Sequence, residues 1–452
     1  MNILIIGAGI VGYNLADELS QEGHNISIVD VHAEKIKQIS EKLDVLWVRG
    51  NACLPSVLIQ AGIRKAEMVI AVTERDEVNL FVCMLAHKFK VKKRFARLRH
   101  MEFTEAGQIF KPHELFIDQA VNPGQIIIEF ILKILETPGA VNCAEFAEGK
   151  ILLRGFDVSA DAPLAGRKIA DLQAAAEFNS FIIVAIVRDG NLIIPGEHDT
   201  IRAGDKMYVL IDKEFLPLIL PMLNRRVNEV QKIILFGANT VSIHLAKCLE
   251  KKIPDISIIE PSLEKADLAV DQLSQTVVLH GDGTDPDLFN EINIKDADFF
   301  MALTDDDEHN ILSALLAKKH GAKRAVVITN DPYYLPILDS IGMNITINPR
   351  LFTVGAILKN LRKGQIRSVF KLIEGEAEIL EIVIAPDSSI IDKKIFKMTF
   401  PRDALIGAIL RHGEMIVPDK ETTIQSGDSV IVVAMPQSIE KIEKIFTKKK
   451  FF

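Results

Sequence analysis

Cysteine and tryptophan are scarce in this sequence. Its 452 residues include four cysteines and one tryptophan. The cysteines, Cys53, Cys83, Cys143 and Cys248, are scattered and show no metal-ligand spacing. We therefore interpret all four as small, buried apolar residues of a protein that occupies a reducing compartment.

Long apolar runs and an excess of basic charge are also missing. Met1–Ala16 carries no charged side chain, but glycines and Asn14 interrupt it. The sequence therefore supports neither a signal peptide nor a run of about 20 apolar residues that would span a membrane. The net charge of −8 argues against a general nucleic-acid binder, which would present a basic face. We expect a cytoplasmic protein that reaches a membrane only through a partner.

The first thirty residues contain the parts of a dinucleotide-binding unit. Ile3–Ile6 is a short apolar run typical of a buried parallel strand, and helical spacing follows through Glu22. The turn between them consists of Gly7, Ala8, Gly9, Ile10, Val11 and Gly12. Gly7 permits the tight turn, Gly9 lets a pyrophosphate approach the backbone, and Gly12 lets helix and strand pack closely. The free N–H groups at the helix start would face the phosphates.

A second apolar run, Ile26–Val29, ends on Asp30. Asp30 lies about 20 residues beyond the glycines, where a carboxylate accepts hydrogen bonds from an adenosine ribose. These features together predict dinucleotide binding. The alternative is a Rossmann fold that kept the turn glycines for packing and lost its ligand.

The whole pattern occurs twice. Alternating strands and helices continue after Asp30, which requires a parallel sheet with right-handed crossovers. Lys232–Gly237 restarts this pattern, and a β-rich segment follows each copy. Arg188-Asp189-Gly190 and Arg411-His412-Gly413 mark a hairpin turn in each β-rich segment. The predicted fold class is α/β, with two Rossmann-like doubly wound parallel-sheet domains, each followed by a small α+β domain.

We place six segments along the chain. The expected boundaries are 1–122 for the first Rossmann domain, 123–138 for a crossover helix, 139–225 for the first small domain, 230–348 for the second Rossmann domain, 349–365 for a crossover helix and 366–448 for the second small domain. Both crossover segments have an apolar stripe, which we expect to be buried.

The second Rossmann copy departs from the fingerprint. Only Gly237 of the three glycines remains, because Asn239 and Ser242 replace the other two. The Asn239 side chain takes space where a pyrophosphate would approach. Glu260 keeps the ribose carboxylate, and Thr304-Asp305 keeps the strand end. This copy either binds a nucleotide more weakly or is a structural half.

With both copies in view, the chain resembles the peripheral regulatory subunits of bacterial Trk-type potassium uptake systems. The resemblance rests on the glycine turn, Asp30, Ala71–Asn79, Arg97 and the repeat of the whole unit. Such subunits contain two tandem regulator-of-potassium-conductance domains. They sit as a homo-oligomeric dimer or tetrameric ring on the cytoplasmic face of a membrane potassium-transporting subunit.

The resemblance implies regulation, with NAD(H) and ATP or ADP as ligands. Its contacts would be Gly7–Val11, Asp30, the strand end Thr73-Glu74, and Arg97. Ligands gather where strand order reverses at the carboxyl ends of parallel strands, and Arg97 could reach a phosphate. The alternative for Arg97 is a solvated basic face. In the second copy, Gly237, Glu260, Thr304 and Asp305 are the corresponding candidates.

Two other function classes remain open. An NAD-dependent oxidoreductase would use the same fingerprint but needs an acid or base beside the nicotinamide. His198 and His412 are the small-domain candidates, and both are better interpreted as surface residues. His309 beside the acidic run Asp305–Glu308 suggests either a metal site or a helix N-terminus, and we favour the helix. A nucleotide-independent scaffold is the remaining alternative.

Overall fold

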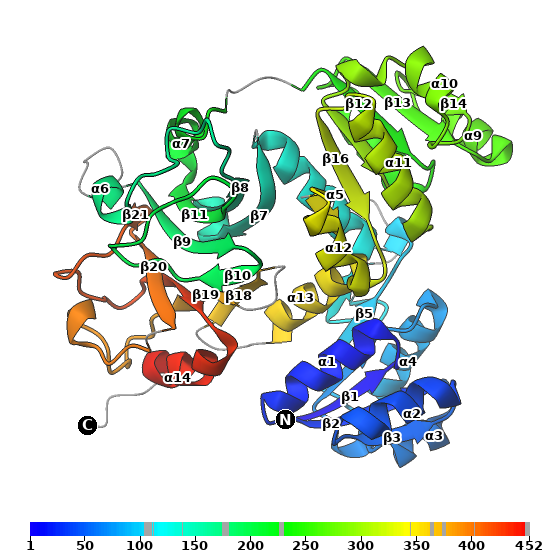
Figure 1. Ribbon diagram of the computed structural model, residues 1–452. Helices are drawn as coiled ribbons and strands as arrows, with labels where there is room; N and C mark the ends of the chain where they lie inside the picture. Colours follow the sequence, from blue (N-terminus) through cyan, green and yellow to red (C-terminus); the bar gives the residue numbers. More distant parts are fainter. Residues whose placement is uncertain are drawn as a thin grey trace. The chain divides into compact units, whose positions relative to one another are not determined.

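The computed structural model describes residues 1–103, 111, 113–137, 139–173, 180–225, 230–343, 345–361, 366–372, 377–401 and 403–447 (Figure 1). The chain divides into two compact units. One contains Met1–Glu129 and Val230–Ile357, and the other contains Phe130–Glu229 and Leu358–Phe452. Each unit therefore takes matching segments from both halves of the sequence.

The first Rossmann domain has a six-stranded parallel sheet with the order β3-β2-β1-β4-β5-β6. Its strands are β1 (Asn2–Ile6), β2 (Asn25–Asp30), β3 (Leu46–Arg49), β4 (Met68–Ala71), β5 (Lys93–Arg97) and β6 (Gln119–Val121). Its main helices are α1 (Ile10–Gln21), α2 (Ala33–Lys42), α3 (Pro55–Gln60) and α4 (Asp76–Lys88). The strand order reverses between β1 and β4, so the doubly wound prediction is confirmed.

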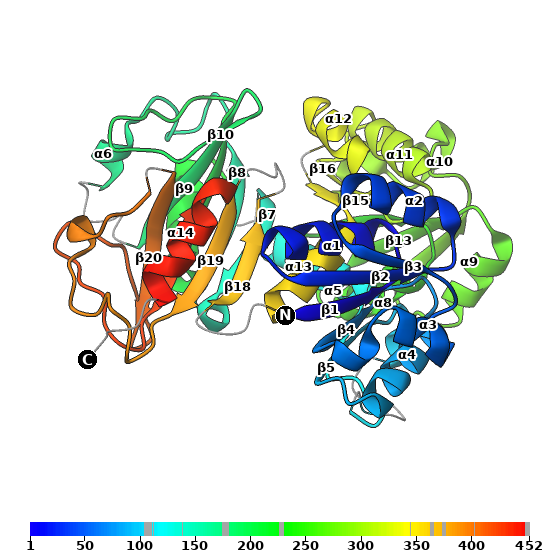
Figure 2. The same ribbon diagram turned by 90° about the horizontal axis from the view of Figure 1, so that it is seen from below.

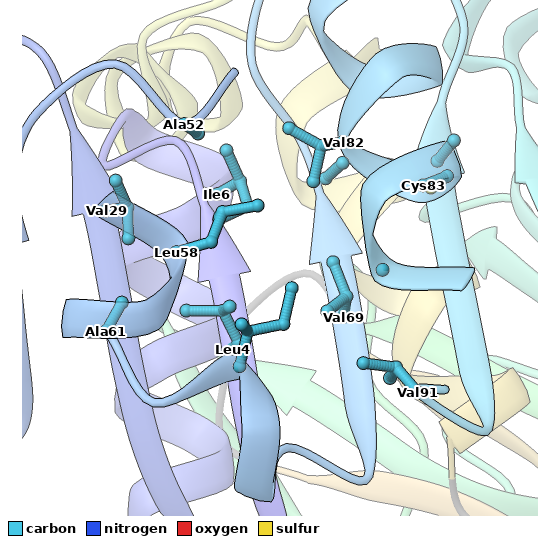
Figure 3. Close-up of a cluster of buried hydrophobic side chains, with 14 of the residues drawn as sticks. Leu4, Ile6, Val29, Ala52, Leu58, Ala61, Val69, Val82, Cys83 and Val91 are labelled. Atoms are coloured by element: carbon cyan, nitrogen blue, oxygen red, sulfur yellow. The ribbon is translucent and has the colours of Figure 1, made fainter. Parts of the chain in front are cut away.

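The central strands of this sheet are buried on both faces. Residues Ile3–Ile6 of β1 and Met68–Ala71 of β4 are almost fully inaccessible to solvent, as expected for parallel strands covered by helices. Figure 3 shows Ile6 of β1 among side chains that include Leu58 of α3 and Val82 of α4. This packing fixes the carboxyl ends of β1 and β4, where the glycine turn and Thr73 follow.

The second Rossmann domain repeats this sheet strand for strand, with the order β14-β13-β12-β15-β16-β17. Its strands are β12 (Lys232–Phe236), β13 (Asp255–Glu260), β14 (Val277–His280), β15 (Phe299–Ala302), β16 (Arg324–Ile328) and β17 (Ile345–Ile347). Its helices are α8 (Thr240–Leu249), α9 (Leu263–Val270), α10 (Pro286–Glu291), α11 (Asp307–Lys319) and α12 (Leu335–Ser340). The duplication inferred from the sequence is therefore present in the fold.

The two small domains also share one topology. Their antiparallel sheets have the orders β10-β9-β11-β8-β7 and β18-β19-β22-β20-β21. The first comprises β7 (Ala140–Phe146), β8 (Ile151–Asp157), β9 (Phe181–Arg188), β10 (Asn191–Ile193) and β11 (Lys206–Asp212). The second comprises β18 (Ile366–Lys371), β19 (Glu378–Val383), β20 (Ala404–Arg411), β21 (Glu414–Ile416) and β22 (Ser429–Ala434). The sequence patterns did not predict β7 or β18.

The hairpin turns lie where the sequence predicts them. Asp189 and His412 adopt positive φ angles of 52° and 51°, each followed by a glycine with positive φ. Short helices complete these domains: α6 (Ile169–Gln173) and α7 (Leu216–Met222) in the first, and α14 (Pro436–Thr447) in the second. Figure 2 shows α14 lying along its own sheet, where it contacts β19 and β22.

One apolar cluster joins the two small domains. It contains Val184 and Leu210 of the first sheet together with Ala408 and Ile431 of the second. A Cβ atom at Gly407 would lie 2.6 Å from Leu210 Cδ1, so the sheets approach too closely for a larger residue there. The two small domains therefore form one core inside a single chain.

The apolar stripes of the crossover helices are buried, as predicted. These helices are α5 (Pro123–Glu136) and α13 (Pro349–Leu361). The division between the two compact units falls inside both helices. Of the predicted stripe residues, Ile126 is only half-buried, and the burial of Leu361 lies outside the description. The others are buried: Ile127, Phe130, Ile131 and Ile134 in α5 and Val354, Ile357 and Leu358 in α13.

The interpretation of all four cysteines as buried residues is wrong for two of them. Cys83 and Cys143 are buried, and burial raises the pKa of the Cys83 thiol to about 12. Cys248 is exposed, and Cys53 is half-buried. Cys53 lies in the turn between β3 and α3, and Cys248 lies near the carboxyl end of α8. Among the described residues, no helix is long and apolar enough to cross a membrane.

Candidate functional site

The glycine turn after β1 has the backbone geometry that its sequence predicts. Gly7 adopts φ of 106°, which disfavours any residue with a side chain. A Cβ atom at Gly12 would lie 1.8 Å from the carbonyl oxygen of Gly7, so only glycine fits there. A Cβ atom at Gly9 would meet nothing within 4 Å. The space above Gly9 is therefore open to a ligand, as the fingerprint requires.

The amino terminus of α1 faces this open space without a side-chain cap. Gly9 occupies the N-cap position, and no side chain there accepts a hydrogen bond from the first turn. The first N–H groups of a helix have no intrahelical acceptor and attract anions. Asp30 lies beside them and accepts hydrogen bonds from the backbone nitrogens of Ala8 at 2.6 Å and His32 at 2.8 Å.

Asn79 positions the neighbouring strand end. Its Oδ1 accepts hydrogen bonds from the Thr73 backbone nitrogen at 3.0 Å and the Thr73 hydroxyl at 2.7 Å. Its Nδ2 donates to the carbonyl oxygen of Arg97 at 2.8 Å. The fully buried Asn79 therefore holds Thr73 and Arg97 in a fixed relation. The sequence analysis quoted Asn79 as part of a motif but did not identify this structural role.

A cavity of about 850 Å³ opens where the strand order reverses between β1 and β4. This volume lies within the range of small-molecule and cofactor sites. The predicted residues that line it are Gly7, Gly9, Ile10, Val11, Asp30, Thr73, Glu74 and Arg97. Ala8 and Gly12 do not line it: Ala8 binds the Asp30 carboxylate, and Gly12 packs against Gly7. The sequence analysis missed other lining residues, among them Lys35, Phe81 and Arg350.

Arg97 is half-buried in the cavity wall, whereas Arg99 is exposed. The Arg97 Nε is buried and has no hydrogen-bond partner in the described structure. Burial lowers the pKa of Arg97 to about 10, with Arg99 and Arg350 lowering it further and Glu74 opposing them. A pKa of about 10 leaves Arg97 charged at neutral pH. Arg97 thus presents an unpaired positive charge to the cavity.

The corresponding turn in the second Rossmann domain is closed by its own side chain. Asn239 caps α8 by accepting a hydrogen bond from the Ser242 backbone nitrogen at 3.0 Å. Its Nδ2 donates to the carbonyl oxygen of Leu303, which follows β15. Asn239 therefore ties the turn after β12 to the end of β15. In the first domain the corresponding space belongs to the cavity.

Other positions of the second domain also differ from the first. The Glu260 side chain is only 6% exposed and accepts hydrogen bonds from Ala238 N at 2.6 Å and Ser262 N at 2.9 Å. Thr304 and Asn310 reproduce the bonds of Thr73 and Asn79. Asn310 binds the carbonyl of Ile328, so Ile328 stands where the first domain has Arg97.

The remaining candidates lie outside the cavity. Gly237, Glu260, Thr304 and Asp305 belong to the second domain, and Asp305 is exposed. Asp306 caps α11 by accepting a hydrogen bond from the His309 backbone nitrogen at 2.9 Å, so the helix N-terminus prediction is confirmed. No group of three metal-ligating side chains occurs among the described residues. His198 and His412 are both exposed.

Two known domain families each match both halves of the chain. The TrkA-N domain matches residues 3–123 and 233–349, and the TrkA-C domain matches residues 153–219 and 379–447. The chain is 32% identical to the Trk system potassium uptake protein TrkA of Halomonas elongata, over 99% of this chain and 98% of that protein. It is 33% identical to TrkA homolog 1 of Methanosarcina mazei, over 99% of this chain and 100% of that protein.

Solved structures share the fold at lower identity. The GsuK channel bound to NAD superimposes with a TM-score of 0.61 and 18% identity, over 98% of this chain and 78% of that chain. The isolated GsuK RCK domain gives the same TM-score and identity, over 98% of this chain and 94% of that chain. The tandem arrangement of parallel and antiparallel sheets is therefore the RCK fold predicted from the sequence.

Proposed function

Because the chain belongs to the TrkA family of tandem TrkA-N and TrkA-C domain proteins, we propose that it is a nucleotide-sensing regulatory subunit of a potassium uptake system. The observation that carries the proposal is the first-domain cavity, with its uncapped helix terminus and unpaired Arg97. Such a site attracts the phosphates of a nucleotide. The GsuK channel bound to NAD has the same fold.

The proposed ligands are NAD(H), with ATP or ADP as alternatives. Gly9 and the start of α1 would bind the phosphates, and Asp30 would accept hydrogen bonds from a ribose. Each carboxylate oxygen of Asp30 accepts a backbone hydrogen bond, from Ala8 or from His32, and has a second lone pair for a ribose hydroxyl. Thr73 and Glu74 would border the nucleotide at the end of β4, and Arg97 would contact a phosphate.

We propose that the second Rossmann domain does not hold a phosphate chain at its glycine turn. Asn239 accepts a hydrogen bond from the N–H group of Ser242, the third residue of α8, and donates one to the carbonyl oxygen of Leu303. Ile328 offers no charge in place of Arg97. Gly237, Glu260, Thr304 and Asp305 would then keep the local fold rather than bind a nucleotide.

Nucleotide binding would act on potassium transport by changing the relative arrangement of Rossmann domains. A ligand shifts such an equilibrium only by its different affinity for the two arrangements. We propose that the chain works as a homo-oligomer, a dimer or tetrameric ring, on the inner face of the cell membrane. Its partner would be a membrane potassium-transporting subunit.

The domain division that we propose follows the sheets. Residues 1–122 and 230–348 would be the nucleotide-binding domains, and 139–225 and 366–448 the small domains. The segments 123–138 and 349–365 would connect them through α5 and α13. The shared core of the two small domains supports this division, because both small domains lie in the compact unit that contains Phe130–Glu229 and Leu358–Phe452.

Thermal unfolding with NADH, NAD, ATP and ADP tests the proposal. A ligand that binds only the native state raises the unfolding temperature. We expect at least one of the four nucleotides to raise the unfolding temperature of the wild type, and none of them to raise that of Gly9→Asp. If all four leave the wild-type temperature unchanged, the sensor proposal fails. Consumption of NADH with a 2-oxo acid would instead support an oxidoreductase.

A further inference from the structure

Arg350 belongs to the crossover helix α13, which directly follows the second Rossmann domain, and it lines the nucleotide cavity of the first Rossmann domain. It occupies the second position of α13, directly after Pro349. The cavity therefore draws side chains from two segments that are far apart in the sequence and belong to the same compact unit. Every other lining residue comes from the first domain.

Arg350 and Arg97 carry like charges at the same cavity and repel each other. Arg350 is one of the charges that lower the pKa of Arg97, which places the two guanidinium groups within electrostatic reach. Within the described part of the chain, neither guanidinium has an ion-pair partner. Arg75, another cation at the cavity, is already bonded to Glu77 at 2.6 Å. Two unpaired arginines that face one cavity provide a site for a polyanion.

The position of Arg350 is fixed by a cap that both repeats share. The Asn348 side chain accepts hydrogen bonds from the backbone nitrogens of Arg350 at 3.1 Å and Leu351 at 3.0 Å. In the first repeat, Asn122 accepts one from Gln125 at 3.2 Å. The residue after the proline is Arg350 in the second repeat and Gly124 in the first. The second repeat therefore has a guanidinium at this position, whereas Gly124 gives the first repeat no side chain there.

We propose that Arg97 and Arg350 form a phosphate clamp, in which the second repeat, through the start of its crossover helix, contributes a binding residue to the nucleotide site of the first. The inference rests on the proposed function, because the clamp needs a ligand with a phosphate chain. That chain is the pyrophosphate of a dinucleotide or the phosphates of a nucleoside diphosphate or triphosphate. The clamp gives the second repeat a role that does not require a nucleotide of its own. It also links the two repeats through the ligand, so that binding restrains one relative to the other.

The test measures the dissociation constants of NADH, ATP and ADP for the full-length wild type and Arg350→Ala. Loss of a charge-assisted hydrogen bond to a phosphate weakens binding about 10- to 100-fold. Weakening of all three ligands assigns Arg350 to the pyrophosphate, and weakening of ATP alone assigns it to the terminal phosphate. Either result supports the clamp. Equal constants for wild type and Arg350→Ala with all three ligands overturn it.

Two controls separate the clamp from general damage. Lys359→Ala removes an exposed positive charge from the same helix, and it should leave the three constants unchanged. Adenosine competes without a phosphate, so its affinity should be equal in wild type and Arg350→Ala. An equal loss of adenosine affinity would contradict phosphate recognition. Without nucleotide, Arg350→Ala should unfold at the same or a higher temperature than wild type, because repulsion of Arg97 is removed.

The same experiment distinguishes this inference from the proposed function. If wild type binds none of the three nucleotides, the proposed function fails and the clamp fails with it. If wild type binds but Arg350→Ala binds equally well, only the clamp fails. Arg350→Lys should lie between wild type and Arg350→Ala, because lysine keeps the charge but loses the planar fork.

Discussion

The two Rossmann domains have the same strand order and the same Asn–Thr bonds at the strand end, but their glycine turns differ: the first opens onto the cavity, and Asn239 crosses the second. The difference lies in the turn after the first strand of each domain. Gly9 leaves the start of α1 uncapped, whereas Asn239 caps α8 and reaches Leu303. One side chain thus supplies from within the protein the hydrogen bonds that a ligand would otherwise supply. A duplicated fold can preserve its scaffold while one copy becomes independent of a ligand.

The largest expected effect is the loss of nucleotide binding when Gly9 of the first turn is replaced. Gly9→Asp places a carboxylate in the open space above the turn, where it would repel phosphate. We expect the nucleotide-induced rise in unfolding temperature to disappear and the affinity to fall more than about 100-fold. Thermal unfolding followed by fluorescence of Trp47, the single tryptophan, reports on the first domain.

The matched control is Asn239→Asp at the corresponding turn. Aspartate keeps the cap on the Ser242 nitrogen but loses the donor to the Leu303 carbonyl, so the second domain should lose some stability while the nucleotide response should be unchanged. Loss of the nucleotide response in Asn239→Asp would mean that the second turn takes part in binding.

The next effect is a loss of stability when Gly12, the third glycine of the motif, is replaced. Gly12→Ala places a methyl group against the Gly7 carbonyl and should lower the stability of the first domain by about 1–3 kcal/mol. Ser242→Ala should be neutral or slightly stabilising, because the buried Ser242 Oγ has no partner in the described structure. Urea unfolding, followed by Trp47 fluorescence and by circular dichroism, compares the two. Equal losses would contradict the assigned difference in packing.

A smaller effect is expected from removing the cap itself. Asn239→Ala removes the bonds to Ser242 and Leu303 and should cost the second domain about 1 kcal/mol. Gly9→Ala removes no side-chain bond and should change stability less. Circular dichroism during urea unfolding measures both variants. A greater loss in Gly9→Ala would show that the first turn depends on more than its open space.

The smallest effect is a pH dependence at the amino terminus of α11 in the second domain. The hydrogen bond that the His309 ring donates to the Asp306 carboxylate raises the pKa of His309, with burial opposing it. A raised pKa means that this contribution is complete below the ordinary histidine pKa of 6.5 and disappears as pH rises through the folded-state value. His309→Ala should therefore lose slightly more stability at pH 5.5 than at pH 8.5. Arg75, at the corresponding cap of α4, provides no such bond, and an equal loss at both pH values would contradict the assignment.

Local sequence was sufficient for most of the fold and for the glycine turn, Asp30, the strand end and Arg97 of the site. Gly7, Gly9 and Gly12 act through backbone geometry and the space around it, and such effects depend on residue type and spacing. The repeat identified the corresponding position of Asn239, so its intrusion into the turn was predicted. Its bond to Leu303 was not, because that contact depends on how β12 and β15 lie side by side.

Arg350 could not be assigned from sequence for a similar reason. Its place in the cavity depends on the packing of the second domain against the first, and no local pattern encodes that packing. β7 was missed because Ala140–Phe146 alternates weakly and gains its burial from neighbouring elements. Asn79 belongs to the sequence motif, but its structural role follows from its hydrogen bonds to Thr73 and Arg97, which the sequence alone does not show.

The number of nucleotides bound per chain tests the central claim most directly. Isothermal titration calorimetry of the full-length protein with NADH and with ATP should give one bound molecule per chain when either binds. The same titration of Gly9→Asp should give none. Two molecules per chain in wild type, with one remaining in Gly9→Asp, would contradict the account, because the second Rossmann domain would then be an independent nucleotide site.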